Sequence, residues 1–292
     1  MIDTRTVGPS LSQRPHRFRC RGRLLDLAET TRIVGIVNVT PDSFSDGGRY
    51  VDPGAAIDQA MRLVDEGADI VELGGESSRP GATAVPAQEE LDRVVPVLRP
   101  LRAALAIPLA IDTYKPEVAQ VVLDEGADLI NDIYGVRGEG GMAEVVARAG
   151  AGLVIMHMKG TPREMQIDPY YDDVVGEVLA FLQDRVAFSE DVGVDPEAII
   201  VDPGLGFGKR MEDNLVLLRS LHEFHRLGKP IMVGPSRKSF IGKVLDLPVE
   251  ERREGTAACV AAAILQGAAF VRVHDVRPAK RMVTMLDAIR SA

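Results

Sequence analysis

The sequence predicts an α/β fold, a (β/α)8 TIM barrel whose bottom is closed by a short N-terminal hairpin. The first observation is a series of eight short apolar runs without period-2 alternation, which is typical of strands buried on both faces of a parallel sheet. The second is their spacing, because the roughly 14 to 40 residues between successive runs are enough for a crossover helix. The runs are Ile33–Val37, Asp69–Leu73, Pro108–Ile111, Asp128–Ile130, Gly152–Met156, Ala198–Val201, Pro230–Val233 and Ala269–Val271.

The segment before the first run predicts the hairpin. Arginine recurs at every second position of residues 17–24, a period of 2 rather than 3.6, which favours two short strands. We expect residues 1–15 to form a loose tail. Residues 16–292 are expected to form one barrel domain, since α/β barrels of this length are commonly a single domain.

Helical patterns between the strands complete the barrel. Some end in a glycine that we interpret as a left-handed cap, as in the repeated Asp-Glu-Gly-Ala-Asp of 65–69 and 124–128. The insertions 39–52 and 76–85 leave the carboxyl end of the barrel, where long loops are more often lids or binding loops than passive connectors. Helices are expected at 54–66, 88–104, 116–125, 142–149, 172–192, 213–227, 250–267 and 278–290.

Composition disfavours several classes of protein. The formal charge of −9 argues against non-specific nucleic-acid binding, which needs a basic surface. No apolar stretch reaches the roughly 18 residues that a membrane span requires, and the N-terminal region has no apolar signal-peptide core. Cys20 and Cys259 lie far apart without metal-ligand spacing, so we expect reduced thiols in a cytoplasmic protein.

Polar residues follow the ends of the predicted strands, where the active site of such a barrel lies. After the last two strands come Ser236-Arg237-Lys238 and Arg272-Val273-His274, and Asn38 follows the first. Loops after strands seven and eight commonly hold phosphate, and Lys238 begins a helix whose amide groups would add to anion binding. These residues predict a phosphate or pyrophosphate site; the alternative is a salt-bridged rim.

Asp112, Asn131 and Asp202 end three further strands and should point into one cavity. Buried carboxylates need partners. Because little cationic sequence lies beside them, the partner could be a ligand with several N–H groups, such as an amino-pyrimidinone ring. A divalent metal is the alternative, and spacing alone leaves both open.

The glycine-rich segment 204–209 fails as a P-loop, because Pro203 and Arg210 stand where glycine and a hydroxyl residue are needed. We expect its glycines to bring backbone close to a flat ligand, with Phe207 stacking beside it. His157 lies between Met156 and Met158, so a packed, hydrogen-bonded histidine is favoured over a catalytic base.

Several long motifs in order closely resemble the dihydropteroate synthase family of pterin-binding enzymes. The resemblance covers residue 32 to the C-terminus. The motifs that carry it are residues 36–48, 74–81, 111–115, 131–133, 156–166, 202–209, 236–242 and 272–276.

The resemblance implies a reaction, a metal and an assembly. The reaction is condensation of 6-hydroxymethyl-7,8-dihydropterin pyrophosphate with 4-aminobenzoate, giving dihydropteroate and pyrophosphate in folate synthesis. Mg²⁺ would assist, sulfonamides would target the enzyme, and a homodimer is typical. The apolar, small-residue-rich segment Thr256–Ala268 would suit such a dimer contact. The alternatives are another pterin-binding barrel, such as a methyltransferase acting on a reduced folate, or a non-catalytic paralogue.

The resemblance also implies roles by position. Asp112, Asn131, Asp202 and Lys238 would bind the pterin, between walls formed by Met156 and Phe207. Asn38, Arg272 and His274 would hold pyrophosphate, with Asn38 as the metal ligand. The aminobenzoate site would comprise Phe44, Ser78, Arg79, Pro80 and Ser236. The catalytic set would be Lys238, Asp46, Arg272 and His274, with Asp46 closing the first loop.

Two further expectations concern chemistry. Ser78 stands where the family usually has threonine, so the hydroxyl survives but a methyl contact with aminobenzoate is lost. No nucleophile–base pair is evident in the chain. We therefore expect a dissociative displacement, in which the electron-rich dihydropterin stabilises positive charge on its CH2 group as pyrophosphate departs.

Overall fold

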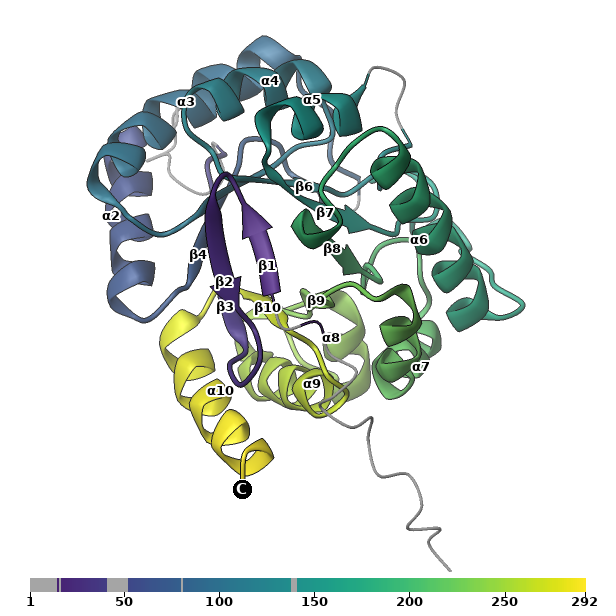
Figure 1. Ribbon diagram of the computed structural model, residues 1–292. Coiled ribbons are helices and arrows are strands. Elements are labelled where there is room, and N and C mark those ends of the chain that lie inside the picture. Colours follow the sequence, from purple (N-terminus) through teal and green to yellow (C-terminus); the bar gives the residue numbers. More distant parts are fainter. Residues whose placement is uncertain (1–14, 16, 41–51, 80, 138–140) are drawn as a thin grey trace, which may run out of the picture.

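A closed ring of eight parallel strands forms the centre of the protein (Figure 1). The computed structural model describes residues 15, 17–40, 52–79, 81–137 and 141–292. Hydrogen-bonded neighbours follow the order β8-β7-β6-β5-β4-β3-β10-β9, and a parallel bridge between Val201 and Ile231 links the two ends. The strands are β3 (Arg32–Asn38), β4 (Ile70–Gly74), β5 (Leu109–Asp112), β6 (Leu129–Asp132), β7 (Gly152–Met156), β8 (Ile199–Asp202), β9 (Met232–Val233) and β10 (Phe270–Val273). The predicted barrel is confirmed.

Helices surround the ring and cover its outer face. Seven of the eight predicted helices are present within three residues of the expected bounds. They are α2 (Pro53–Asp65), α3 (Ala87–Ala104), α4 (Pro116–Asp124), α5 (Met142–Ala149), α6 (Val174–Asp191), α9 (Arg253–Leu265) and α10 (Val276–Arg290).

Two differences from the predicted helices lie between β8 and α9. The expected helix 213–227 is divided into α7 (Met211–Arg219) and a 3-10 segment, η3 (Leu221–Leu227). In a 3-10 helix, residues three apart lie on one side, and here Leu221 and Phe224 are both fully buried. A short helix, α8 (Ser239–Leu245), follows Lys238, whose position at a helix start was expected.

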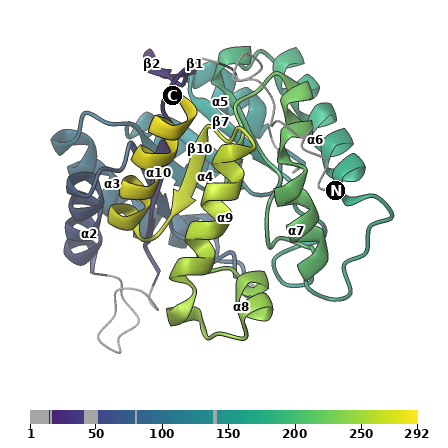
Figure 2. The ribbon, with the colours of Figure 1, turned by 90° about the horizontal axis from the view of Figure 1, so that it is seen from below.

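The N-terminal hairpin closes the amino end of the barrel, as predicted. Strands β1 (Arg17–Cys20) and β2 (Arg23–Asp26) pair antiparallel. Phe18 is fully buried, and its ring meets that of Phe270 edge-to-face with centroids 5.5 Å apart. Figure 2 shows the hairpin at one end of the molecule and α8 at the opposite end.

Alternation along the strands explains why polar groups gather at one end. Side chains of a barrel strand point alternately inward and outward. The inward positions at the amino end are apolar and form one cluster with the hairpin, including Val34, Ile70, Ala110, Val154 and Ile200. Two residues further along the strands, the inward positions are Ile36, Glu72, Asp112, Met156, Asp202 and Arg272. The interior therefore changes from apolar to charged within one step of the pleat.

Among the described residues, no helix is long and apolar enough to cross a membrane. Most of the predicted tail, residues 1–14, lies outside the described residues, as does most of the first insertion, residues 41–51.

Candidate active site at the carboxyl end of the barrel

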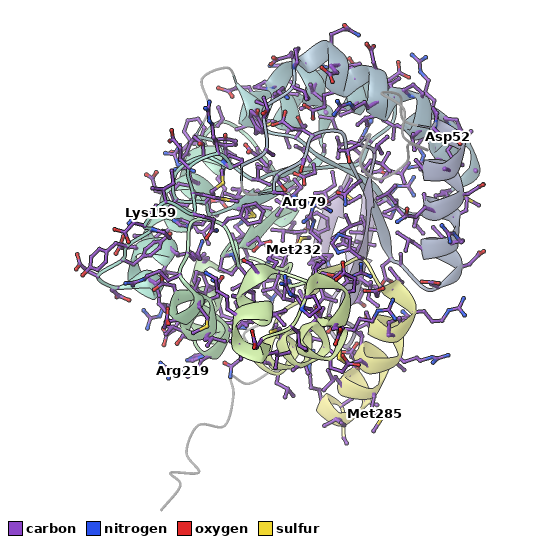
Figure 3. The ribbon with its side chains drawn as sticks, turned by 180° about the vertical axis from the view of Figure 1, so that it is seen from behind. Asp52, Arg79, Lys159, Arg219, Met232 and Met285 are labelled. Carbon is purple, nitrogen blue, oxygen red and sulfur yellow. The ribbon has the colours of Figure 1, made fainter. Side chains whose placement is uncertain are left out.

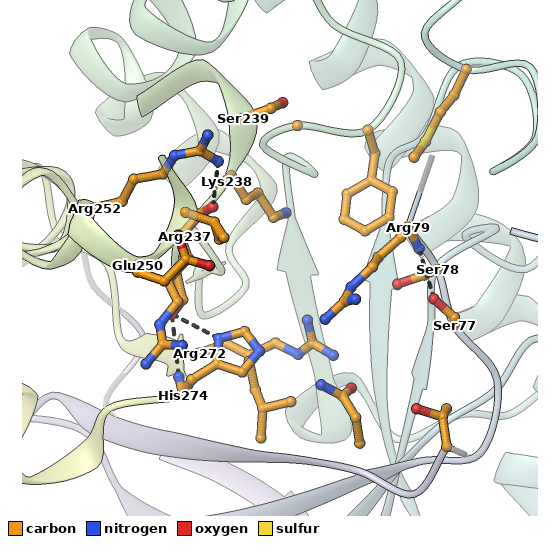
Figure 4. Close-up of a pocket in the computed structure, with 18 residues that line it drawn as sticks. Ser77, Ser78, Arg79, Arg237, Lys238, Ser239, Glu250, Arg252, Arg272 and His274 are labelled. Carbon is orange, nitrogen blue, oxygen red and sulfur yellow. Dashed lines mark hydrogen bonds between the residues drawn. The ribbon is translucent and has the colours of Figure 1, made fainter. Parts of the chain in front are cut away.

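A cavity of about 780 Å³ opens at the carboxyl end of the strands (Figure 4). Eight residues predicted for the site line it: Asn38, Ser78, Arg79, Phe207, Ser236, Lys238, Arg272 and His274. In Figure 3 Arg79 lies over the middle of the barrel, whereas Asp52 and Arg219 lie at its edge. Residues separated by more than 230 positions therefore meet at one cavity, as the strand-end argument predicted.

Asp112, Asn131 and Asp202 were expected to point into this cavity, but they are not among the described residues that line it. Asn131 and Asp202 are buried, and Asp112 lines a smaller neighbouring pocket with Ser78. Burial raises the pKa of Asp202, and the Asp202 Oδ1 atom accepts a hydrogen bond from the Gly204 N–H at 2.7 Å. The Asn131 Oδ1 atom is buried and has no hydrogen-bond partner among the described residues. A buried acceptor without a donor is costly, so this oxygen is suited to a ligand N–H group.

Asp112 is held by an arginine that the sequence places 160 residues away. The Arg272 Nη2 atom donates to Asp112 Oδ2 at 2.9 Å, and the Arg272 Nε atom donates to Glu72 Oε1 at 2.7 Å. Burial raises the pKa of Asp112 to about 7; Arg272 opposes the rise and Glu72 adds to it. Arg272 therefore balances this carboxylate, a partner that neither the ligand nor the metal alternative included. Asp112 and Glu72 thus share Arg272 in one buried ionic cluster next to the cavity.

Glu72 contacts the site but was not predicted from the sequence. It is 1% exposed and lies inside β4, within an apolar run rather than after it. Its carboxylate accepts from both Nε and Nη2 of Arg272 and so fixes the guanidinium plane. Alternation along β4 was the available signal, because an acid at an inward position of a buried strand requires a partner.

Lys238 lies between an aromatic ring and a buried acid. Its Nζ atom is 4.2 Å from the centroid of the Phe207 ring and donates to the Leu205 carbonyl. Burial lowers the pKa of Lys238 to about 7, while the nearby Asp202 charge opposes the shift. Met156 and Phe207 belong to one buried apolar cluster, consistent with two walls of a slot.

Ser236 and His274 form a hydrogen-bonded pair, with the Ser236 Oγ atom 2.9 Å from His274 Nδ1. Burial, and then the Arg272 charge, lower the pKa of His274 to about 4, so its imidazole is neutral near pH 7. Ser236 thus contacts a residue predicted for pyrophosphate rather than another residue predicted for aminobenzoate. Ser239, which the sequence analysis did not select, also lines the cavity.

Salt bridges, the alternative considered for these loops, are present at two cationic residues, Arg237 and Arg272. The Arg237 guanidinium pairs with both carboxylate oxygens of Asp275, at 2.7 Å from Nη2. Arg237 lines the cavity together with Lys238 and Arg272 (Figure 4). Phe44, Asp46 and Pro80 lie outside the described residues.

Two glycines of the loop 204–209, Gly204 and Gly208, approach protein backbone, whereas Gly206 lines the cavity. Gly204 has φ +69°, and a Cβ atom there would meet the His157 carbonyl oxygen at 1.9 Å. The prediction that the glycines approach a flat ligand is therefore wrong for Gly204, whose neighbour is the His157 carbonyl. Phe207, from the same loop, does line the cavity. Only glycine fits a position with both constraints.

Lys209 fastens this loop to the end of β7. Its buried Nζ atom lies 2.9 Å from His157 Nδ1, 3.0 Å from the Gly204 carbonyl oxygen and 3.0 Å from the Phe207 carbonyl oxygen. His157 is 6% exposed and accepts from this lysine. The interpretation of His157 as a packed, hydrogen-bonded residue is confirmed.

This pairing predicts a change in the pH dependence of stability. Burial, and then the Lys209 charge, lower the pKa of His157 from 6.5 to about 2. A lowered folded-state pKa means that neutral His157 stabilises the fold above pH 6.5, and that this contribution is lost as pH falls toward 2. When the pH falls from 7.0 to 5.5, the decrease in the free energy of unfolding should therefore be about 1 kcal/mol smaller for His157→Gln than for the unmodified protein. Urea unfolding at both pH values measures the difference; equal losses would contradict the assignment.

The side chains available as metal ligands limit how a metal could bind. Within the part of the chain that the structure describes, no group of three or more His, Cys, Asp or Glu side chains could hold a metal ion. Asn38 lines the cavity and offers an amide oxygen there. One neutral oxygen fits Mg²⁺ only as part of a shell completed by phosphate and water, which is how Mg²⁺ usually binds.

Comparisons with known proteins agree with this geometry. A family model described as pterin binding enzyme matches residues 34–274. The dihydropteroate synthase of Synechocystis sp. is 47% identical over 267 residues, covering 91% of this chain and 92% of that protein. The Yersinia pestis dihydropteroate synthase, solved with a sulfonamide drug, has a TM-score of 0.89 and 42% identity, covering 94% of this chain and 100% of the other. The Xanthomonas albilineans dihydropteroate synthase in complex with 7,8-dihydropteroate has a TM-score of 0.84 and 41% identity, covering 94% and 99%.

Proposed function

The chain belongs to the pterin-binding enzyme family, and from this premise we propose how its site performs the dihydropteroate synthase reaction. The enzyme condenses 6-hydroxymethyl-7,8-dihydropterin pyrophosphate with 4-aminobenzoate, giving 7,8-dihydropteroate and pyrophosphate in folate biosynthesis. It is a transferase of the pterinylmethyl group and, like its Yersinia pestis relative, a sulfonamide target. The alternative of a methyl-transferring barrel is not favoured, because the relatives matched over nearly the whole chain are synthases.

The observation that carries this function is that buried hydrogen-bond acceptors lie close to the cationic side chains that line the cavity. In the proposal, Asp112, Asn131 and Asp202 accept hydrogen bonds from the N–H groups of the pterin ring. The orphaned Asn131 Oδ1 atom supports this assignment, since it needs a donor. Lys238 donates to the opposite edge of the ring, and Met156 and Phe207 hold its faces.

Pyrophosphate binds beside the pterin in this proposal. Arg272 has donors left over after its contacts with Glu72 and Asp112, and a guanidinium fork suits phosphate oxygens. The neutral His274 imidazole and the Asn38 amide complete the anion site. Mg²⁺ bound through pyrophosphate and Asn38 would neutralise the charge that develops on the leaving group.

In the proposed site, aminobenzoate lies beside Ser78 and Arg79, which line the cavity from the loop after β4. The roles of Phe44, Asp46 and Pro80 stay predictions from the family resemblance. Ser236, paired with His274, would stand between the two substrates.

The proposed chemistry is a dissociative displacement. The C–O bond to pyrophosphate breaks first, the dihydropterin stabilises the resulting cation, and the amine lone pair then forms the new C–N bond. The product ammonium is acidic, so its proton can pass to water without a strong base. The walls of the cavity keep competing water from the cation.

This mechanism predicts how the rate depends on the amine. For a series of ring-substituted 4-aminobenzoates at saturation, the rate of pyrophosphate release should be nearly independent of amine basicity, because bond breaking precedes attack. Single-turnover measurements across the series give the slope of log rate against amine pKa. A steep positive slope would contradict the dissociative order.

A genetic experiment tests the function itself. The chain should restore growth, without added folate-pathway end products, to a bacterium that lacks its own dihydropteroate synthase. The same strain carrying the Asp202→Ala variant should fail to grow. Failure of the unmodified chain at normal expression would contradict the assignment.

A homodimer is also part of the proposal. Helix α9 exposes Ala258, Ala262 and Leu265 along one face, and Leu265 is 53% exposed. Small and apolar side chains spaced in this way suit packing against a second copy. Light scattering should give twice 31.5 kDa, and Leu265→Glu should lower that mass. A mass of 31.5 kDa for the unmodified protein at micromolar concentration would exclude the dimer.

The proposed compartment is the cytoplasm. Cys20 and Cys259 are both free thiols, which agrees with a reducing environment.

A further inference from the structure

A buried lysine outside the proposed substrate contacts joins two loops at the carboxyl end of the barrel. Lys115 follows β5 and is the N-cap residue of α4, three positions after Asp112. Its Nζ atom lies 2.5 Å from Glu76 Oε2 and 2.5 Å from Glu90 Oε2. The side chains of Lys115, Glu76 and Glu90 are 12%, 11% and 1% exposed. This is a three-membered ionic cluster that is almost sealed from solvent.

The cluster lies at the neck of the loop that carries Ser78 and Arg79. Glu76 begins this loop, and its Oε2 atom also accepts from the Val85 N–H, near the loop's end, at 3.2 Å. The opposite oxygen, Oε1, accepts from the Tyr114 hydroxyl at 3.0 Å. One carboxylate thus ties both ends of the loop to the residues that follow β5.

Helix α3 holds the other side of the neck. Glu90 extends from α3 to Lys115, and the Arg93 Nη1 atom donates to the Gly75 carbonyl at 2.7 Å. Gly75 packs so tightly that a Cβ atom there would lie 2.7 Å from a Val94 methyl group. The start of the loop is therefore clamped between α3 and Lys115, whereas Arg79 itself is exposed at the cavity.

Stability alone gives little reason for this arrangement. Burying two carboxylates and one ammonium carries a desolvation cost, and well-packed apolar residues are often equally stable in such places. Ionic groups with directional contacts instead select one geometry. Here the ionic contacts fix one conformation of the loop that carries Ser78 and Arg79.

We propose that Lys115 is a positioning residue for the aminobenzoate site, acting with Glu76 and Glu90 to fix the loop that presents Ser78 and Arg79. This inference rests on the proposed function, which assigns those two residues to aminobenzoate. Asp112 shares a small pocket with Glu76 and Glu90, but its own strand and Arg272 hold its position, and Asn131 and Asp202 lie on other strands.

Steady-state pyrophosphate release, with each substrate varied in turn, tests the role. Lys115→Met should raise KM for 4-aminobenzoate by about tenfold, since small misplacements of binding groups have effects of this order or larger. KM for dihydropterin pyrophosphate should stay near that of the unmodified protein. Lys115→Arg, which retains the charge, should recover part of the loss.

Lys229→Met is the matched control. Lys229 is similarly buried, with an 8% exposed side chain, and its Nζ atom pairs with Glu190 at 2.5 Å near the amino end of the barrel. Its replacement should lower Tm but leave both KM values unchanged. If Lys115→Met fails to fold, Glu76→Gln, which is isosteric, carries the same expectation for the aminobenzoate KM.

Two results would overturn the positioning role: variants whose aminobenzoate KM is unchanged, or variants whose two KM values rise in parallel. Failure of the proposed function has a different signature. In that case the unmodified protein itself would release no pyrophosphate in response to 4-aminobenzoate, and the role inferred for Lys115 would fall with it.

Discussion

Lys238→Ala is expected to lower kcat/KM for dihydropterin pyrophosphate by about 10² to 10³, the range seen when one preorganised donor is removed from an active site. The Lys238 Nζ atom is buried beside the Phe207 ring and opposes the charge of Asp202. Its loss removes a donor to the pterin and leaves Asp202 with less compensation. Initial rates of pyrophosphate release at varied substrate concentration measure the effect.

The control for this variant lies on the same short helix. Lys243 is exposed in the last turn of α8 and does not line the cavity. Lys243→Ala should therefore retain the kcat/KM of the unmodified protein. Equal rates for the two variants would contradict the role of Lys238.

Arg272→Met is expected to abolish activity and to lower the free energy of unfolding by about 3 to 5 kcal/mol, the cost of leaving a buried charge without its partner. Glu72 and Asp112 both depend on this guanidinium. Burial opposes the charged form, but the two carboxylates raise the pKa of Arg272, so the arginine stays charged. Urea unfolding measures the stability, and pyrophosphate release measures the activity.

The double variant Glu72→Gln/Arg272→Met separates the two effects. The Glu72→Gln change neutralises one of the two carboxylates that lose Arg272. It should therefore recover part of the lost stability, because fewer buried charges remain unpaired. Activity should not return, since the group that holds pyrophosphate is still missing. A single variant as stable as the unmodified protein, or a double variant that regains activity, would contradict this account of the ion pair.

Most of the fold could be predicted from the sequence, because a strand buried on both faces and a helix with a glycine cap leave local patterns. The site could be located for the same reason: in a barrel, every strand exit faces one cavity. Glu72 was missed because it lies inside an apolar run rather than after it. Its importance depends on which face of β4 it occupies and on Arg272, 200 residues away.

The glycine-rich loop shows a second limit. Its composition correctly indicated a close approach of backbone, but the sequence could not tell whether a ligand or another strand end would approach. In the structure the neighbour of Gly204 is the His157 carbonyl, and Lys209 hydrogen-bonds to that carbonyl. Which group approaches the glycine depends on tertiary packing, and local composition carries no information about that packing.

The most direct test of the central claim is pyrophosphate release by purified protein supplied with dihydropterin pyrophosphate and Mg²⁺, with and without 4-aminobenzoate. We expect release that depends on the amine, yields 7,8-dihydropteroate in equal amount, and is lost in Asp202→Ala. No release by a protein that still binds the pterin tightly would contradict the claim, and would indicate a barrel that binds pterin without transferring it.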